Sequence, residues 1–101
     1  MKTSYFISLN MRTANGFECF GRFDLGCDRQ FAYSLFDSLR GTDAVNETDM
    51  LHMDLMEVPN GLPVNLRVIG CTSMDIALNG KIITEAMFKL LNLGETMIER
   101  E

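Results

Sequence analysis

The stretch YFISLNMRTANGFECFGRFDL, residues 5–25, decides the fold because it predicts two β-strands joined by a tight turn. Apolar and polar residues alternate on both sides of Asn15-Gly16, and Asn-Gly between alternating runs is a strong hairpin signal. A second stretch, LHMDLMEVPNGLPVNLRVI at residues 51–69, repeats this plan around Asn60-Gly61. Each hairpin is followed by residues with helical periodicity. The chain is therefore expected to contain two copies of one ββα unit.

Two helices are expected, one after each hairpin. Asp28 is the expected N-cap of the first, which should end before Gly41. Its apolar residues at helical spacing are Phe31, Ala32, Leu35, Phe36 and Leu39. The second helix is expected from about Lys81 to Gly94. Residues 72–80 fit either a short helical turn with a capping box or a third hairpin turn at Asn79-Gly80, and residues 95–101 should extend the helix or fray.

The order ββα-ββα predicts a single α+β domain over residues 1–101. The simplest packing has two layers, with a four-stranded, mainly antiparallel sheet and both helices on one face. This order of elements is that of a circularly permuted ferredoxin-like plait. A chain of 101 residues can bury roughly two thirds of its unfolded surface in such a domain.

The length of each hairpin loop decides which residues share a face of the sheet. A three-residue loop at residues 14–16 would place Met11 beside Cys19 and put Phe17, Phe23 and Leu25 on the same apolar face. In the second hairpin an even-length loop is expected, because it keeps His52 and Asp54 off the apolar face. An unpaired buried carboxylate would cost several kcal/mol. That face would then hold Leu51, Met53, Leu55, Val64, Leu66 and Val68.

The sheet face that the helices leave uncovered is expected to mix large apolar residues with charged ones. Such a surface suits self-association or the binding of a partner or ligand. The chain is therefore interpreted as a small non-enzymatic domain that forms a homodimer or docks a protein partner through this face. The residues expected there for partner binding are Phe20, Arg22, Asp54, Met56, Arg67 and Ile69, with Asp24 beside them.

A small enzyme or ligand-binding protein is the alternative interpretation. His52 and Asp54 stand two residues apart on a strand and so share a face, which is half of a general-base arrangement. Cys27 and Cys71 each precede a capping residue at a helix start, where the helix dipole lowers the pKa of a thiol. This alternative requires a pocket in which His52, Asp54 and either Cys27 or Cys71 converge.

Composition narrows the classes of partner. The net charge is −5, and residues 41–66 contain five acidic residues and no Lys or Arg. A nucleic-acid-binding protein would carry a basic face, so no nucleic acid is expected. The acidic connection at residues 41–49 is a further possible docking site, in a subunit of a larger assembly.

Location, membrane association and cofactors are judged from the same composition. No apolar run reaches the ~20 residues of a membrane span, so no membrane partner is expected. Three cysteines without a CxxC spacing and a single His argue against a zinc site. No metal or cofactor is therefore expected, and reduced thiols favour a cytoplasmic location.

Overall fold

The computed structural model describes residues 2–46 and 48–92 and has six elements of regular structure. They are β1 (Ser4–Thr13), β2 (Gly16–Gly26), α1 (Arg29–Asp37), β3 (Leu51–Val58), β4 (Val64–Cys71) and α2 (Ser73–Asn92). The prediction of an α+β chain with two ββα units is confirmed. The prediction for residues 95–101 lies outside the described residues.

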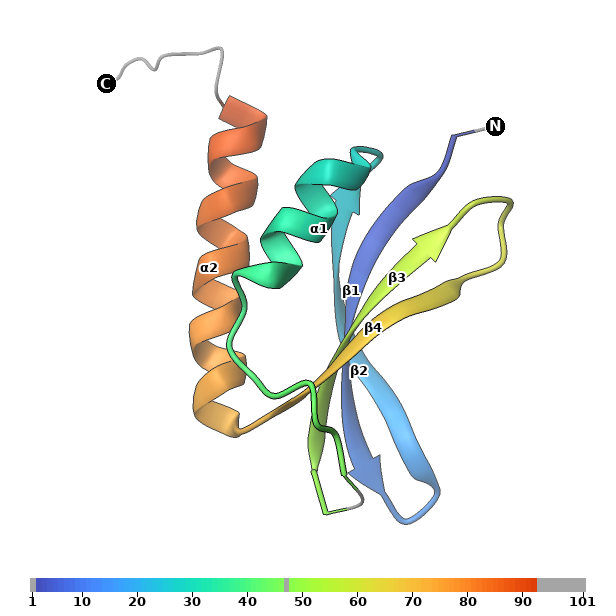
Figure 1. Ribbon diagram of the computed structural model, residues 1–101, viewed down its shortest axis with the longest axis vertical. Coiled ribbons are helices and arrows are strands. Elements are labelled where there is room, and N and C mark those ends of the chain that lie inside the picture. Colours follow the sequence, from blue (N-terminus) through green and yellow to red (C-terminus); the bar gives the residue numbers. More distant parts are fainter. Residues whose placement is uncertain (1, 47, 93–101) are drawn as a thin grey trace.

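The four strands form one antiparallel sheet in the order β2-β1-β3-β4. Both helices lie on one side of this twisted sheet (Figure 1). The circularly permuted ferredoxin-like plait is not confirmed. In that plait the strands that lead into the helices would be central, whereas here β2 and β4 are the edge strands.

The core lies between the sheet and the helices. Ile7, Met53 and Leu55 project into it from the central strands and are fully buried. The helices contribute Ala32, Leu35 and Phe36 from α1 and Ile83 from α2. As predicted, the Asp28 side chain caps α1, accepting a hydrogen bond of 3.1 Å from the Phe31 amide.

Helix α2 runs straight through Asn79-Gly80, which excludes a third hairpin turn there. Its first turn is a capping box, in which Thr72 and Asp75 exchange two hydrogen bonds of 3.0 Å between backbone amides and side chains. The Asn79 side chain is fully buried and bonds to the backbone of Arg40, accepting from its N–H at 2.7 Å and donating to its C=O at 2.8 Å. The amide thus serves the tertiary structure instead of a turn.

The first hairpin departs from the predicted register. Thr13 pairs with Gly16, so the loop has two residues and not three, and Gly16 takes the positive φ of 104°. Phe20 is then an extra, bulged residue, because Leu9 pairs with Gly21 while Asn10 pairs with Cys19.

The bulge at Phe20 returns the residues that follow it to the face on which they were predicted. Phe23 and Leu25 pack towards the core as predicted, but Phe17 and Cys19 lie opposite Arg12 and Asn10, on the face away from the helices. The predicted proximity of Met11 to Cys19 is therefore wrong.

The second hairpin also contains a register shift. Glu57 pairs with Val64, so the residues between them, 58–63, are even in number as predicted. A shift beside Leu66 then brings Met53 opposite Ile69 and Asp54 opposite Val68. His52 and Asp54 stay away from the core, as expected, but Val68 accompanies them, and the predicted placing of Val68 with Met53 is wrong.

The connection from α1 to β3 closes the outer edge of β4. Thr42 and Gly70 exchange two backbone hydrogen bonds of 2.9 Å. A side-chain oxygen of Asp49 lies 2.5 Å from where a Cβ on residue 70 would stand, so a larger residue there would displace the Asp49 carboxylate. The connection is thereby tied to the sheet at this point.

Candidate functional site

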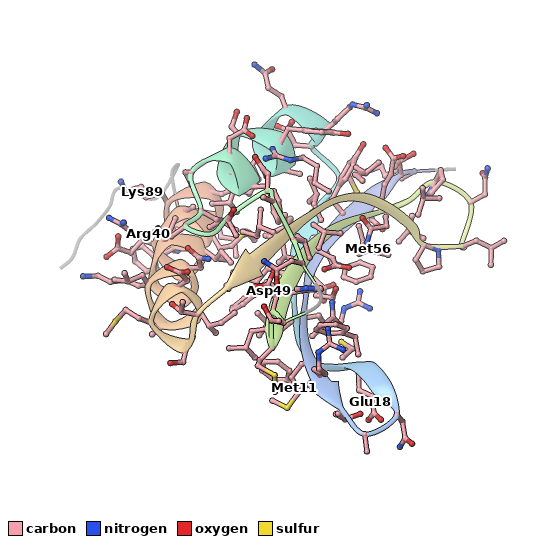
Figure 2. All side chains as sticks on the ribbon, turned by 60° about the horizontal axis from the view of Figure 1, so that its bottom comes forward. Met11, Glu18, Arg40, Asp49, Met56 and Lys89 are labelled. Carbon is pink, nitrogen blue, oxygen red and sulfur yellow. The ribbon has the colours of Figure 1, made fainter. Side chains whose placement is uncertain are left out.

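The face of the sheet turned away from both helices, called the open face below, is built on alternate residues of β1 and β3. Three cross-strand pairs line its centre: Asn10 with His52, Ser8 with Asp54, and Phe6 with Met56. Of these residues, Met56 is labelled in Figure 2. Phe6 and Ser8 are only 8% and 7% exposed. The open face is therefore not a flat solvated surface, since its own side chains bury its centre.

Asp54 carries an unmet hydrogen-bonding capacity. The Asn65 side-chain amide donates to its Oδ2 at 2.7 Å, but its Oδ1 is buried without a partner among the described residues. Burial raises the pKa of Asp54, and this effect is opposed by the hydrogen bond from Asn65, by the nearby Asn10 amide, which itself donates to Ser8 Oγ at 3.1 Å, and by His52. The carboxylate is consequently a strong acceptor that the fold satisfies only in part.

His52 is fixed in place by stacking. Its ring lies 4.0 Å from the Phe17 ring between centroids, at an angle of 14° between the planes. The Arg12 guanidinium lies 4.7 Å from the centroid of Phe17. Nε2 of His52 is buried and, like Oδ1 of Asp54, has no partner in the described part of the chain.

Aromatic and cationic side chains surround this polar centre. The Arg22 guanidinium lies over Phe6, 3.8 Å from the ring centroid, and forms an ion pair of 2.7 Å with Asp24. Phe17 and Phe20 remain 38% and 48% exposed. Exposed rings beside half-buried polar groups are the composition of a binding surface.

Two residues predicted for the open face are not on it. Ile69 is 5% exposed in the core, opposite Met53. Arg67 projects to the helix side, where it bonds to Asp37, forms an ion pair of 3.5 Å with Asp43 and lies over Phe36. Both predictions are wrong because the shift beside Leu66 exchanges the faces of the following residues. Arg22, Asp54 and Met56 do lie on the open face, and Phe20 is exposed at its bulge.

Cys71 is not an activated thiol. It lies on the helix side of β4, where its Sγ is 3.6 Å from the Arg40 carbonyl oxygen. Burial, together with the nearby Asp75 and Asp49 carboxylates, raises the pKa of Cys71 to about 11. The expected lowering of this pKa by the helix N-terminus is wrong, because burial and two acidic neighbours outweigh the dipole.

The groups required for catalysis do not converge. Cys71 pairs with Leu51 and His52 with Gly70, so the thiol and the imidazole project from opposite faces of the sheet. Cys27 is exposed and follows Gly26, which pairs with Tyr5, five positions along β1 from the Asn10 that faces His52. At ~3.3 Å per residue this is about 17 Å, far beyond hydrogen-bond reach.

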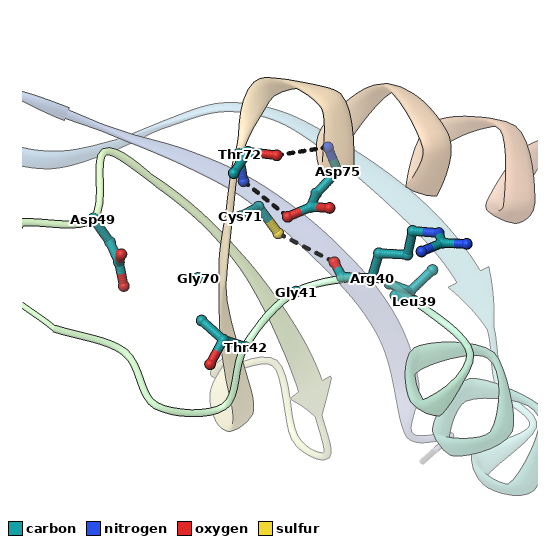
Figure 3. Close-up of a pocket in the computed structure, with 9 residues that line it drawn as sticks. All are labelled: Leu39, Arg40, Gly41, Thr42, Asp49, Gly70, Cys71, Thr72 and Asp75. Carbon is teal, nitrogen blue, oxygen red and sulfur yellow. Dashed lines mark hydrogen bonds between the residues drawn. The ribbon is translucent and has the colours of Figure 1, made fainter.

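A cleft of about 520 Å³ lies where the connection after α1 passes the end of β4 and the start of α2 (Figure 3). Its polar lining includes Asp49, Cys71, Thr72 and Asp75. Thr72 and Asp75 bond to each other, as the dashed lines in Figure 3 show. Neither His52 nor Asp54 lines it, and the described residues hold no cluster of metal-ligating side chains. Among the described residues that line the cleft, the Cys71 thiol has a raised pKa and lies with carboxylates instead of with the imidazole of His52.

Comparisons with known proteins give no family model, no curated protein and no solved structure that matches this chain. Within residues 2–46 and 48–92, no helix is long and apolar enough to cross a membrane.

Four residues of this site escaped the sequence-based prediction: Ser8, Asn10, Phe17 and Asn65. Asn10 and Asn65 are polar residues within strands that are otherwise rich in apolar residues, and this is the sequence signal that could have indicated a place in the site. Their importance depends on which residues lie across from them, and both hairpin registers contain shifts.

Proposed function

We propose that this protein is a non-enzymatic binding domain whose open face holds a protein partner. The observation that carries the proposal is the pair of buried, unpartnered atoms at its centre, Nε2 of His52 and Oδ1 of Asp54. Leaving a buried polar atom unpaired costs roughly 1–3 kcal/mol. A partner that displaces the side chains covering these two atoms and supplies the missing hydrogen bonds would recover part of that free energy on binding.

The chemistry of the centre indicates what the partner presents. Asp54 needs a donor, and its negative charge favours a cationic one. The exposed rings of Phe17 and Phe20 offer apolar and cation–π contacts to the stem and head of such a side chain. The net charge of −5 also attracts basic partners over longer distances. The proposed partner segment therefore carries an Arg or Lys among apolar residues.

A cytoplasmic location is part of the same proposal. None of the three cysteines, all within the described residues, forms a disulfide, and Cys19 and Cys27 are exposed. Exposed thiols persist in a reducing compartment. No observation favours the alternative of a small enzyme, since His52 and Asp54 meet neither thiol.

Selection from a random peptide library, with the immobilised protein as bait, tests the proposal. The enriched peptides are expected to share an Arg or Lys flanked by apolar residues. Titration calorimetry with one synthetic peptide then compares variants. Asp54→Asn should weaken binding about tenfold, which corresponds to ~1.4 kcal/mol. The matched control is Asp24→Asn, because Asp24 is exposed on the same face and already paired with Arg22.

Amide chemical shifts locate the bound peptide. Perturbations at Ser8, Asn10, His52 and Asp54 would support the proposal. Enriched peptides without a basic residue, or equal binding by the wild type and Asp54→Asn, would overturn it. Circular dichroism of both variants verifies that each remains folded.

A further inference from the structure

The outward side of α2 is unusually apolar for a surface helix. Of its 20 residues, Asn79 and Ile83 are buried. Met74, Leu78 and Phe88 are 66%, 37% and 67% exposed. Figure 1 shows α2 at the outer margin of the molecule, with α1 and the sheet on its inner side. An exposed stripe of this kind requires an explanation.

Three of the exposed apolar residues, Met74, Leu78 and Phe88, fit a heptad spacing, whereas Leu90 and Leu91 are also exposed but lie off this line. Steps of four and three residues connect the six positions of the outward stripe: Met74, Leu78, Lys81, Glu85, Phe88 and Asn92. At 3.6 residues per turn these positions form one line along the helix. Ile83 is buried on the inner side and comes nine residues after Met74, which is two and a half turns, so the two side chains project to opposite sides of the helix. The stripe is thus directly opposite the face that packs in the core.

The stripe is also self-complementary when two copies run antiparallel. If the helices cross at the level of Ile83, position 78 meets position 88, position 81 meets 85, and position 74 meets 92. Leu78 then packs on the partner's Phe88, and Lys81 meets the partner's Glu85. A parallel pair would instead set Lys81 against Lys81 and Glu85 against Glu85, which is repulsive.

From this charge complementarity we propose that two copies of the chain form an antiparallel homodimer through the outward stripe of α2. The arrangement is isologous, so each contact occurs twice. The two apolar pairs of Leu78 and Phe88 flank a centre of two Lys81–Glu85 pairs. The stripe between residues 74 and 92 is about 27 Å long at 1.5 Å per residue, which gives several turns of contact.

This inference goes beyond the proposed function, because it concerns the opposite side of the molecule. Helix α2 packs on the covered face of the sheet, away from His52 and Asp54. Figure 2 shows the separation, with Lys89 on α2 far from Met56 on the sheet. A dimer through α2 leaves both open faces accessible, so either proposal can fail without the other.

Sedimentation velocity over a range of micromolar concentrations tests the dimer. The wild type should approach twice the chain mass of 11.4 kDa. Phe88→Glu should weaken association about a hundredfold, because it replaces both buried rings with carboxylates, two in the dimer, beside the two carboxylates of Glu85. Leu62→Glu is the control, since Leu62 is 78% exposed on the loop between β3 and β4.

Charge reversal tests the antiparallel register. Lys81→Glu and Glu85→Lys should each weaken self-association about tenfold, because each creates like-charge pairs. An equimolar mixture of the two single variants should restore the dimer, and the double variant should restore it alone. These recoveries would not occur if the substitutions acted through folding.

A wild type that stays monomeric at all concentrations would overturn the inference. So would a dimer that survives Phe88→Glu, or charge-reversed variants whose mixture does not reassociate. A dimer that Met56→Asp disrupts and Phe88→Glu does not would place self-association on the open face and would equally overturn it.

Discussion

The two faces of the sheet treat their buried polar groups in opposite ways. On the covered face, both polar atoms of the Asn79 amide bond to the backbone of Arg40. On the open face, Asp54 and His52 each keep one buried atom without a partner among the described residues. Under the helices a buried polar side chain links two distant segments of the chain, whereas on the open face two buried polar atoms have no partner within the described part of the fold.

The most direct test of this comparison is to truncate, one at a time, two adjacent residues of β4 whose side chains project to opposite faces of the sheet. Ile69→Ala should lower the free energy of unfolding by about 3 kcal/mol, because Ile69 fills the core. Val68→Ala should lower it by about 1 kcal/mol, because Val68 lies opposite Asp54 on the open face. Urea unfolding of both variants measures the difference. Equal losses would contradict the assigned register of β4.

The next largest effect on the free energy of unfolding is expected from Asn79, whose side-chain amide has both of its polar atoms hydrogen-bonded. Asn79→Ala should cost about 2–3 kcal/mol, because it leaves the N–H and C=O of Arg40 without their partner. Asn92→Ala is the matched control near the end of the same helix, where the side chain donates to the Phe88 carbonyl oxygen four residues earlier. If the two substitutions destabilise equally in urea unfolding, Asn79 does not have the structural role described here.

Thiol reactivity compares a covered group with exposed ones. The pKa of Cys71 rises from the ordinary 9.0 to about 11, which lowers its thiolate fraction about a hundredfold at mildly alkaline pH. Iodoacetamide should therefore modify Cys19 and Cys27 rapidly and Cys71 slowly, as peptide mass spectrometry would show. In denaturant all three should react at similar rates. Rapid native modification of Cys71 would show that its site is open.

The smallest effect concerns the unsatisfied carboxylate. Burial raises the pKa of Asp54 in the folded state, so the folded protein binds this proton more tightly than the unfolded chain. Ionisation of Asp54 therefore opposes folding above the raised pKa, and this cost disappears as the pH falls below the ordinary pKa.

Asp54→Asn should consequently stabilise the protein on the order of 1 kcal/mol at neutral pH. The gain should vanish in acid, where the wild-type carboxyl group is protonated as well. Urea unfolding of both proteins across the acidic range measures it. A variant that is less stable than the wild type at neutral pH would mean that the carboxylate is better satisfied than its contacts indicate.

Local patterns sufficed for most of the fold. Both hairpins, α1 with its Asp28 cap and the capping box at Thr72 follow from residues that are neighbours in sequence. The start of α2 did not follow, because Asn79-Gly80 is also a turn signal. What decides it is the bond between Asn79 and Arg40, which are 39 residues apart in the chain.

The faces of the sheet were predictable only in part. The free-energy cost of burying a carboxylate predicted that Asp54 and His52 lie on the open face, and the structure has them there. The shifts at Phe20 and Leu66 were not predictable, because an alternating pattern gives no signal for one extra residue. Phe17 entered the site because the first loop has two residues instead of three, and the shift beside Leu66 moved Arg67 and Ile69 to the other face.

The bridge between Thr42 and Gly70 has a consequence for the behaviour of the protein at high concentration. An exposed strand edge is a template on which a second chain can polymerise into a fibre. At this point of β4 the molecule occupies its own edge, and the Asp49 carboxylate beside Gly70 adds a charge there. The same short connection that borders the cleft thus also acts as a built-in safeguard against edge-to-edge aggregation.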